Sequence, residues 1–537
     1  MRAFIKSHAP YLLAITFIVM FLTRNLWGTR AWIETHDGIF HLIRQEVFTD
    51  VLRTGQFPVR WASSLDNGFG LPLFNYIYPG PYYLGSPLSL LGLSSKWVIK
   101  AVEIGLYLVG GFGMYFLLFR KNKLFATVAA IFYLTTPYFL LNIFVRGALG
   151  EFMAISFMPW ILLSLQDLSV RKGLRWYHPL PYFFMFIAHN FLSFLFLPIY
   201  FLVVMQYRKI WKTSIASLVL SLGLAAFFVL PMLLERNLLF SVTNQNFTYN
   251  YLDHFVYPIQ LIYGKWGNGH SYAGLNDRIS FALGLTALIA LIWGTITAIR
   301  RHNPDLTRWL IITGLVLFFT LPFSLPIWQL VKPLQMIQFP WRLLSFTPIT
   351  VPLVSFYLLL SQKKSRAIYI IIGILVVISL YFATRYSTPP YFQNNDQLAQ
   401  QFYIHRDQTT TSSRIEMLPR WAPLKEKWKG EENLRVERGS SSVTSVTSTP
   451  TKIVFTAETE DPDAIYRIRR NYFPSWSVKD ESGASYDLEP TVDGEINFTG
   501  STGGHTYTVY VGSTKIEILA NLISLLALIY LLKLGFR

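Results

Sequence analysis

The chain has 537 residues, of which 52% are hydrophobic and only 14% are charged, and this composition excludes an ordinary soluble enzyme. The formal net charge of +17 does not indicate nucleic-acid binding, because the basic residues form small clusters between apolar runs and not one stripe. The absence of cysteine excludes disulfides, thiolate catalysis and cysteine-bound metal, and it leaves the redox compartment open.

Apolar runs recur along the chain, and a span needs about 20 such residues, or fewer where neighbouring helices shield it. The first run has no small-residue cleavage site after it, so it is predicted to be an uncleaved span and not a signal peptide. The segment 81–93 is short and rich in proline, which favours a re-entrant or interfacial piece. The predicted spans are 10–27, 97–119, 124–142, 152–168, 176–188, 190–206, 213–234, 279–299, 309–324, 343–360, 367–384 and 515–533.

The basic clusters provide an independent test of this count, because Lys and Arg concentrate in cytoplasmic loops. With about twelve spans every cluster falls on the same side, whereas a miscount by one would move the later clusters outside. We therefore predict a polytopic α-helical membrane protein whose N- and C-termini are both cytoplasmic. The clusters are Arg2/Lys6, Arg120/Lys121/Lys123, Arg171/Lys172/Arg175, Arg208/Lys209/Lys212, Arg300/Arg301/Arg308, Lys363/Lys364/Arg366 and Lys533/Arg537.

This topology divides the chain into a transmembrane domain over residues 1–384, an extracytoplasmic domain over 385–514, and a final helix and tail over 515–537. The transmembrane domain includes a large first outer loop over residues 28–96, and shorter outer segments cover 235–278 and 322–342.

Within the outer domain, the stretch from Glu437 to Pro450 is predicted to be a flexible linker. From Thr451 onward, apolar and polar residues alternate in short runs separated by Gly and Asp, a pattern typical of a small antiparallel β-sandwich. The runs are 452–455, 466–469, 496–498 and 507–510.

Residues 37–52, shortly after the first span, are predicted to form a helix, since nothing after Gly38 interrupts it. Asp37, His41 and Arg44 fall on a face next to an apolar stripe, and this arrangement predicts an interfacial amphipathic helix with its polar face upward. The apolar stripe at helical spacing consists of Phe40, Ile43, Val47 and Val51.

Glu34 and Asp37 form an acidic pair beside the membrane and next to a histidine. Such a pair suits a general base or a divalent-cation site. It is equally explained as a helix N-terminus, with Thr35 as the cap and the acids favoured by the helix dipole. The loop that follows, over residues 67–83, is rich in Gly, Pro and aromatic residues, and it is interpreted as either a cavity wall or an interfacial loop.

Further ionisable residues lie at the outer ends of the predicted spans, where they are functional candidates by default. Arg146 and Glu151 share one turn, and a mutual ion pair would also explain them; a satisfied helix cap would also explain His189. Arg342 is flanked by Pro340 and Trp341 and suits an anion ligand. Carboxylates suit activation of a hydroxyl nucleophile, and arginines suit a phosphate or pyrophosphate leaving group.

Several motifs resemble bacterial membrane proteins labelled 6-pyruvoyl-tetrahydropterin synthase-related, over most of residues 30–345. The stretch Asn471–Trp476 is similar to related large bacterial membrane proteins implicated in glycosylation. The pterin label does not fit, because the soluble pterin synthases bind zinc through histidines that include a His-x-His pair, which none of the ten histidines forms. The motifs are Glu34–His41, Gly55–Trp61, Asn67–Gly70 with Pro72–Phe74, Arg146–Ala148, His189–Asn190 and Gln338–Arg342.

The architecture is also similar to the GT-C glycosyltransferases, which use polyprenyl-phosphate sugar donors. In that superfamily an acidic residue in the first outer loop is the key catalytic group, and Asp37 occupies this position, with Glu34 as the other candidate. Here Thr35 and His36 separate the acids, which leaves open which one acts and whether a divalent cation is needed. The resemblance implies a glycosyltransferase of the bacterial plasma membrane that moves a sugar to an envelope glycan, lipid or protein acceptor on the outer face.

In this hypothesis Asp37 deprotonates or orients the acceptor hydroxyl, and Arg342, with Arg146 or Arg60, holds the donor phosphate. Glu34 and Glu151 position the sugar or a divalent ion, and His41 and His189 complete the substrate-binding set. No other cofactor and no nucleic acid is expected; the remaining partner is membrane lipid. One alternative is a transporter or flippase of lipid-linked saccharides, which usually shows broken helices and repeated halves. Another is a non-catalytic scaffold for envelope assembly.

Overall fold

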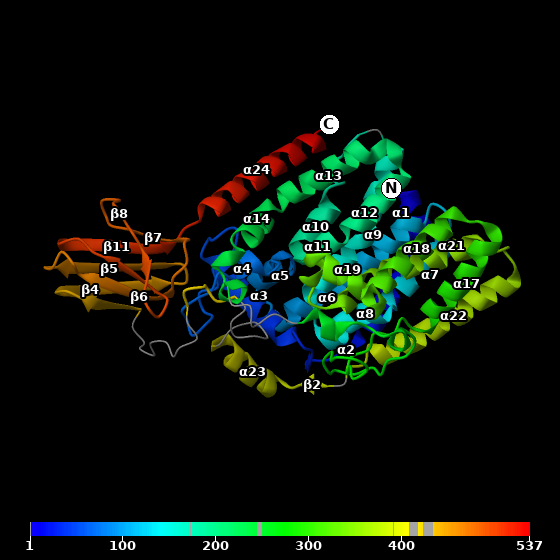
Figure 1. The fold of residues 1–537 in the computed structure, drawn as a ribbon, viewed down its shortest axis with the longest axis horizontal. Helices are drawn as coiled ribbons and strands as arrows, with labels where there is room; N and C mark the ends of the chain where they lie inside the picture. The colour runs from blue at the N-terminus through cyan, green and yellow to red at the C-terminus, as the bar shows by residue number, and fades with distance from the viewer. Residues whose placement is uncertain are drawn as a thin grey trace.

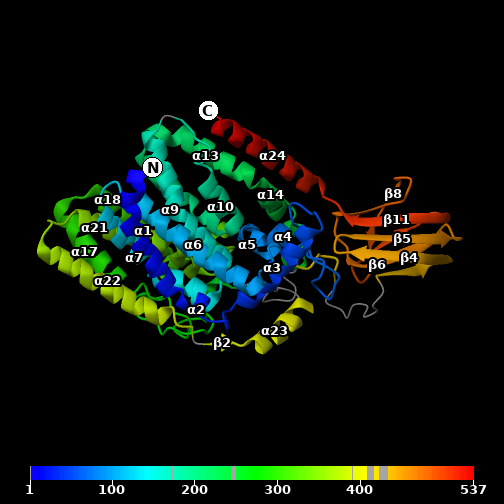
Figure 2. The ribbon, with the colours of Figure 1, turned by 180° about the vertical axis from the view of Figure 1, so that it is seen from behind.

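The computed structural model describes residues 2–171, 173–243, 250–389, 391–407, 417–422 and 433–536, so Lys172 and Arg537 of the basic clusters lie outside the described residues. A large helical region makes up most of the molecule, and a β-domain lies at one end of it (Figure 1). The start of α1 and the end of α24 both lie on the upper side of the helical region, whereas α3 and α23 lie toward its lower side (Figures 1 and 2).

Helix occurs within every predicted span. Among the described residues, five helical segments are long and apolar enough to cross a membrane, or up to eight if each of three bent pairs is one span. The count of about twelve therefore stays a prediction. The five are α6 (Ser95–Leu118), α9 (Leu149–Val170), η7 with α21 (Pro340–Leu360), α22 (Arg366–Tyr386) and α24 (Lys515–Gly535).

Two further helices, of 10–17 apolar residues, lie in the predicted first and sixth spans: Lys6–Leu22 in α1, and Leu192–Gln206. α1 packs against α6 and α7, as Figure 2 shows from behind. The other helices are α1 (Arg2–Leu22), α2 (Arg24–Trp27), α3 (Gly38–Arg53), α4 (Leu73–Tyr76), α5 (Gly80–Leu90), α7 (Lys123–Leu134), α8 (Pro137–Leu141), η1 (Asn142–Arg146), α10 (Leu180–Ala188), α11 (Leu192–Leu195), α12 (Leu197–Gln206), η2 (Arg208–Ile210), α13 (Trp211–Leu224), α14 (Ala226–Leu234), η3 (Arg236–Leu238), α15 (Phe240–Thr243), η5 (Tyr251–His254), α16 (Pro258–Ile262), α17 (Leu285–Arg301), α18 (Pro304–Thr320), η6 (Pro322–Ser324), α19 (Leu325–Leu330), α20 (Lys332–Gln335), η7 (Pro340–Phe346), α21 (Thr347–Leu360) and α23 (Asn395–Asp407).

The helix predicted over residues 37–52 is confirmed as α3, but its environment differs from the prediction. It is not a surface helix, because α5, α6 and α23 pack against it and its polar residues His41, Arg44, Gln45 and Thr49 are buried, with Gln45 fully inaccessible. Gln45 donates from Nε2 to Thr49 Oγ1 at 3.1 Å and to Ser89 Oγ at 3.3 Å. A buried amide must find such partners, and a sequence pattern does not reveal whether protein or water supplies them.

The β-domain consists of two antiparallel sheets, with strand orders β3-β6-β10-β9 and β4-β5-β11-β7-β8. The runs predicted as strands are confirmed as β5, β6, β10 and β11. Aromatic residues that include Phe455, Tyr466 and Tyr507 fill the space between the sheets. The strands are β3 (Leu434–Arg438), β4 (Ser441–Thr449), β5 (Lys452–Thr459), β6 (Ile465–Asn471), β7 (Trp476–Lys479), β8 (Ser485–Tyr486), β9 (Glu489–Pro490), β10 (Glu495–Thr499) and β11 (Gly503–Val511), with a separate pair β1 (Trp32–Ile33) and β2 (Phe392–Gln393).

The linker predicted over Glu437–Pro450 is wrong, because β3 and β4 occupy most of it. β4 pairs with β5 along its length, from Ser441 opposite Thr459 to Thr449 opposite Lys452. Its Ser-rich composition is typical of a linker, but its Val and Thr residues are β-branched and favour a strand once a partner strand is present.

The β-domain docks on the first outer loop through Asn471. The side chain of Asn471 donates to Asp66 Oδ2 at 2.8 Å and to Gly70 O at 2.7 Å, and its backbone N–H donates to Phe69 O at 2.8 Å. Beside these bonds the ring of Trp61 meets Trp476 edge to face, with centroids 5.4 Å apart. The irregular loop is therefore buried against protein, as its unpaired backbone requires.

Candidate functional site

The turn that carries Glu34 and Asp37 is held by backbone hydrogen bonds from two distant segments. The backbone N–H of Glu34 donates to Tyr391 O at 3.2 Å, and that of Asp37 donates to Arg146 O at 2.9 Å. α3 begins at Gly38 with Asp37 as the preceding residue, and no side-chain cap is formed there. Asp37, and not Thr35, therefore occupies the cap position, and Glu34 lies outside the helix. The helix dipole favours an acid at the position of Asp37, but it does not account for Glu34.

Gly147 allows the two segments to approach this closely. It follows Arg146 with φ of +62°, and a Cβ placed on it would lie 2.3 Å from Thr35 Oγ1 and 3.0 Å from Gly38 N. A side chain there would be both strained and obstructed. The glycine in the predicted Arg146–Ala148 motif thus brings the arginine next to the acidic turn.

Arg146 and Glu151 form the mutual ion pair that the sequence left open. Arg146 Nη1 lies 2.9 Å from Glu151 Oε2 and also donates to Asn142 Oδ1 at 2.6 Å. The other carboxylate oxygen of Glu151, Oε1, accepts hydrogen bonds from Tyr138 OH at 2.7 Å and from Ser345 Oγ at 2.5 Å. Glu151 is only 1% exposed, and this network compensates the cost of burying its charge.

Arg342 lies on the other side of Glu151. Its Nε is 3.7 Å from Glu151 Oε2, and its Nη1 donates to Ile337 O at 3.0 Å. The Nε of Arg342 and the indole N–H of Trp341 are buried and find no hydrogen-bond acceptor among the residues that the structure describes. The ring of Trp341 also covers the guanidinium of Arg146, at 4.8 Å. Buried donors of this kind suit an anionic ligand.

The two histidines adjoin this cluster as neutral groups. His189 Nδ1 accepts from the backbone N–H of Leu192 at 3.2 Å, which agrees with the helix-cap explanation, and its ring stacks on Tyr78 at 5.8 Å. His41 Nδ1 and Tyr82 OH are 2.8 Å apart. Burial, aided by Arg342, lowers the pKa of His189 to about 3, and burial, aided by Arg44, lowers that of His41 well below its usual value.

Asp37 is half-buried and faces several cations. Burial raises the pKa of its carboxyl group, while Arg146, Arg44 and Arg342 oppose that rise and Glu151 adds to it. Arg44 was not among the predicted site residues, although it lies on the same face of α3 two turns after Asp37. Its guanidinium is buried near Tyr82 and Tyr78.

Four further side chains contact the charged groups of the site, and no sequence pattern identified them as site residues. Tyr138, Asn142 and Ser345 hold the charged groups in place, and Trp341 had been considered only as a flank of Arg342. A tyrosine or serine within an apolar helix is common, so only the folded chain reveals that these side chains meet at one carboxylate.

Arg60 belongs to a different cluster, which joins the first outer loop to α24. Its Nη1 donates to Asn75 Oδ1 at 2.7 Å and its Nη2 donates to Asn521 Oδ1 at 2.8 Å. Asn75 in turn donates to Glu517 Oε1 at 2.6 Å. The structure therefore brings together Asp37, Arg146, Glu151, Arg342, His41 and His189, and it places Arg60 in this other cluster.

A divalent-cation site is not evident in this arrangement. Among the described residues, no group of three or more His, Asp or Glu side chains is placed as metal ligands would be. Glu34 and Asp37 by themselves provide too few ligands, and Glu151 is committed to Arg146 and Arg342. We therefore assign no step to a metal ion.

Comparison with solved structures gives distant matches. The arabinofuranosyltransferase AftD from Mycobacteria is 14% identical with a TM-score of 0.44, and the match covers 71% of this chain and 27% of that one. The Archaeoglobus fulgidus oligosaccharyltransferase in the apo form is 12% identical with a TM-score of 0.39, and the match covers 79% of this chain and 62% of that one. This chain thus spans less than two thirds of the length of either.

Comparison at the level of sequence gives a clearer result. No curated protein matches the sequence. A family model described as 6-pyruvoyl-tetrahydropterin synthase related domain, membrane protein, matches residues 74–387, which is more than half of the chain. The match includes the helices that carry Arg146, Glu151 and Arg342. The chain therefore belongs to the 6-pyruvoyl-tetrahydropterin synthase related family of membrane proteins.

Proposed function

We propose that this chain is a membrane glycosyltransferase of the GT-C type. It would move a sugar from a polyprenyl-phosphate donor to an envelope glycan, lipid or protein acceptor on the outer face of the plasma membrane, with both chain ends in the cytoplasm. The observation that carries the proposal is a half-exposed carboxylate, Asp37, whose charged neighbours are Arg44, Arg146 and Arg342 together with the paired Glu151. A carboxylate can act as a base toward an acceptor hydroxyl, and nearby cations with unpaired hydrogen-bond donors can bind the phosphate that leaves.

Asp37 is the proposed general base. Its carboxylate would take the proton of the acceptor hydroxyl while the hydroxyl oxygen forms a bond to the anomeric carbon of the donor sugar. The bond between that carbon and the polyprenyl-phosphate oxygen would break, and the phosphate would leave with the electron pair, so the anomeric configuration inverts. The raised pKa of Asp37 makes it a stronger base than an exposed aspartate.

Arg342 is the proposed phosphate ligand. Its unsatisfied Nε and the indole N–H of Trp341 would donate to phosphate oxygens and stabilise the charge that develops as the phosphate leaves. Arg146 is engaged by Glu151, so its contribution would be the field of a fixed positive charge. Arg60, which bonds Asn75 and Asn521, is not part of this mechanism.

The remaining groups would orient the sugar. Neutral His41 and His189 can exchange hydrogen bonds with hydroxyl groups without adding charge. Glu34, next to Asp37, would contact the sugar, whereas buried Glu151 would act as a positioning residue for Arg146 and Arg342. The β-domain, docked on the first outer loop, would bind the acceptor or cover the site.

A transporter of lipid-linked saccharides is the second candidate, and one observation favours it. Three helix pairs in the described chain are sharply bent: α7 with the Pro137–Arg146 helix by 45°, α13 with α14 by 76°, and α18 with the Pro322–Leu330 segment by 83°. Broken helices are frequent in secondary transporters. Arg146, Glu151 and Arg342 lie in η1, α9 and η7 and not at these bends, which favours the transferase.

The deciding experiment is sugar transfer by purified protein in lipid, using a panel of radiolabelled polyprenyl-phosphate sugars. The wild type is compared with Asp37→Asn and with Asp50→Asn, a control at an exposed acid of α3 that pairs with Arg53. The transferase predicts that label reaches an acceptor or water with the wild type and the control but not with Asp37→Asn. Movement of intact labelled donor between leaflets by all three proteins, without transfer, would instead establish the transporter.

A further inference from the structure

A small cavity opens between helices at the end of the helical region far from Asp37. α6 begins beside the first outer loop, where Lys100 Nζ donates to Thr29 O at 2.9 Å, and it ends at the cavity with Leu117 and Leu118. A helix of 24 residues spans about 36 Å. The basic clusters beside the cavity place this end on the predicted cytoplasmic side.

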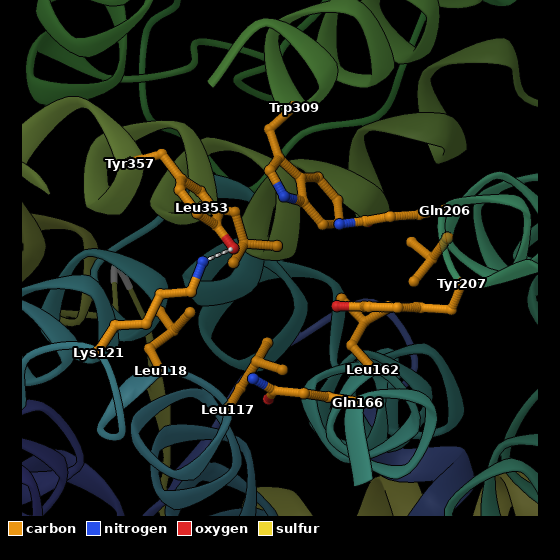
Figure 3. A pocket seen from close by; sticks show the side chains of 11 residues that line it. Leu117, Leu118, Lys121, Leu162, Gln166, Gln206, Tyr207, Trp309, Leu353 and Tyr357 are labelled. Atoms are coloured by element: carbon orange, nitrogen blue, oxygen red, sulfur yellow. Dashed lines mark hydrogen bonds between the residues drawn. The ribbon is translucent and has the colours of Figure 1, made fainter. Parts of the chain in front are cut away.

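The cavity has a volume of about 70 Å³, several times the ~10–15 Å³ that one water molecule needs. Its polar lining comes from different helices: Gln166 from α9, Gln206 from α12, Trp309 from α18 and Tyr357 from α21, together with Lys121 after α6 and Tyr207 after α12. Figure 3 shows Lys121, Tyr357 and Tyr207 directed toward the opening from opposite walls. The residues that line it in the described chain include no carboxylate.

The charge balance around the cavity is positive. Lys121 Nζ lies 3.2 Å from Tyr357 OH and 3.4 Å from Asp305 Oδ2. Asp305 is shared with Arg308, at 3.0 Å, so one carboxylate faces two cations. The Lys121–Asp305 pair is partly solvent-exposed, and such a pair contributes little stability. A ligand anion can therefore replace the carboxylate at low cost.

Apolar side chains share the walls of this cavity with the polar groups. They are Leu117, Leu118, Leu162, Val203 and Leu353. A cationic and polar opening between apolar walls, at the predicted membrane surface, suits the phosphate group of a membrane lipid.

We propose that this cavity binds the phosphate group of an anionic phospholipid from the leaflet on that side. Lys121 and the hydroxyls of Tyr207 and Tyr357 contact the phosphate, and Gln166 contacts the glycerol or headgroup. Basic pockets between transmembrane helices on the cytoplasmic side are suited to such headgroups. The site is separate from the proposed transferase site and does not depend on that function.

The test measures lipid binding by the full chain in detergent, by native mass spectrometry, during titration with dioleoyl phosphatidylglycerol or dioleoyl phosphatidylcholine. Lys121→Gln removes the charge at the cavity, and Lys364→Gln is the matched control, an exposed lysine of the same predicted side. Gln166→Leu keeps the size of a second lining residue but removes its donors. The melting temperature of each variant verifies that it is folded.

We expect the wild type to prefer phosphatidylglycerol. Lys121→Gln should weaken that binding about fivefold, since a basic residue contributes about 1 kcal/mol to anionic lipid binding. Lys364→Gln should leave the binding unchanged. Gln166→Leu should also weaken it. Equal losses in Lys121→Gln and Lys364→Gln would overturn the site in favour of diffuse surface charge. Inorganic phosphate or glycerol phosphate binding as tightly as the lipid would overturn the assignment to a membrane lipid.

Discussion

The backbone N–H of Asp37 donates to the carbonyl oxygen of Arg146 at 2.9 Å. This bond joins the first outer loop to the turn after α8, more than a hundred residues later in the chain. It fixes the proposed base relative to the Arg146–Glu151 pair, and through Glu151 relative to Arg342. The distances between these groups are therefore set by backbone packing as well as by side-chain rotamers.

Gly147→Ala should impair the site. The new Cβ would lie 2.3 Å from Thr35 Oγ1 and would displace the Asp37 turn, and a misplacement of about 1 Å can cost 10²-fold in rate. Gly55→Ala is the matched control, because Gly55 also has a positive φ (+86°) but open space around its Cβ position. Both variants carry about 1 kcal/mol of backbone strain, so sugar transfer should fall in Gly147→Ala only. Equal activity in the two variants would show that the close approach is unimportant.

Asp37→Asn should abolish transfer without lowering stability. Burial raises the pKa of Asp37 above its usual 3.8, so the contribution of this group to stability is fully present below the unfolded pKa and is lost as pH rises through the folded pKa. Above the folded pKa the ionised carboxylate is a cost that asparagine does not carry, so we expect the variant to melt there at or above the wild-type temperature. Transfer should fall by about 10²-fold or more.

The wild-type rate should also decrease as pH falls through the raised pKa of Asp37, since only the carboxylate acts as a base. Thermal melting from pH 4 to 8, with Asp50→Asn as reference, measures the effect of Asp37→Asn on stability. A pH–rate profile of the wild type measures the effect of pH on sugar transfer. A clear drop in the melting temperature of Asp37→Asn would mean that the carboxylate stabilises the fold.

Asn471→Ala should loosen the β-domain from the first outer loop. The variant loses the side-chain bonds to Asp66 and Gly70, and the loss of the buried bond to the Gly70 carbonyl costs about 1–3 kcal/mol. Hydrogen exchange in residues 61–71, measured in nanodiscs, should become faster, while the strands of the β-domain stay protected. Asn497→Ala in β10 is the control. Faster exchange throughout the β-domain would indicate a folding defect and not undocking.

The free energy of unfolding should depend on pH through Glu235, which accepts a hydrogen bond from Thr514 just before α24. Burial raises the pKa of Glu235 to about 7; Glu517 adds to the rise, while the hydrogen bond from Thr514 and the charge of Arg60 oppose it. The stabilising contribution of protonated Glu235 is therefore present below pH 4.5 and is lost as pH rises through about 7. Its size is of the order of 1 kcal/mol after allowance for solvent screening.

Glu235→Gln mimics the protonated form, so its melting temperature should change less between pH 5 and pH 8 than that of the wild type. Differential scanning fluorimetry in detergent measures this difference. Parallel pH profiles for the two proteins would assign the pH dependence to other groups.

Local patterns predicted several elements correctly. The spacing of Phe40, Ile43, Val47 and Val51 located α3, and the alternation after Thr451 located β5, β6, β10 and β11. Such periodicity reflects one buried face of a helix or strand, and it can be read from a single segment without knowledge of the rest of the fold. The linker prediction failed over Ser441–Thr449 because a strand of this composition forms through pairing with β5, which lies beyond the segment itself.

The candidate site was predicted only in part. Position at the ends of apolar runs identified Arg146, Glu151 and Arg342, because a charge beside a bilayer is costly without a function or a partner. Asp37 was selected from the acidic pair in the first outer loop and the GT-C resemblance. Arg60 was selected from the same loop, but its partners lie on α4 and α24. Arg44 was omitted, because a charged residue in a helix is usually assigned to solvent.

The sequence by itself determined the class of protein, the positions of α3 and of four strands of the β-domain, and the chemical types available for a site, since hydropathy and periodicity are properties of single segments. Only the tertiary structure decided which charges meet: Arg146 with Glu151, Arg342 beside that pair, and Arg60 with Asn75 and Asn521. Charge partners are chosen by the packing of segments far apart in the chain. Because a buried charge is stable only with its partner in place, those choices follow from the complete fold.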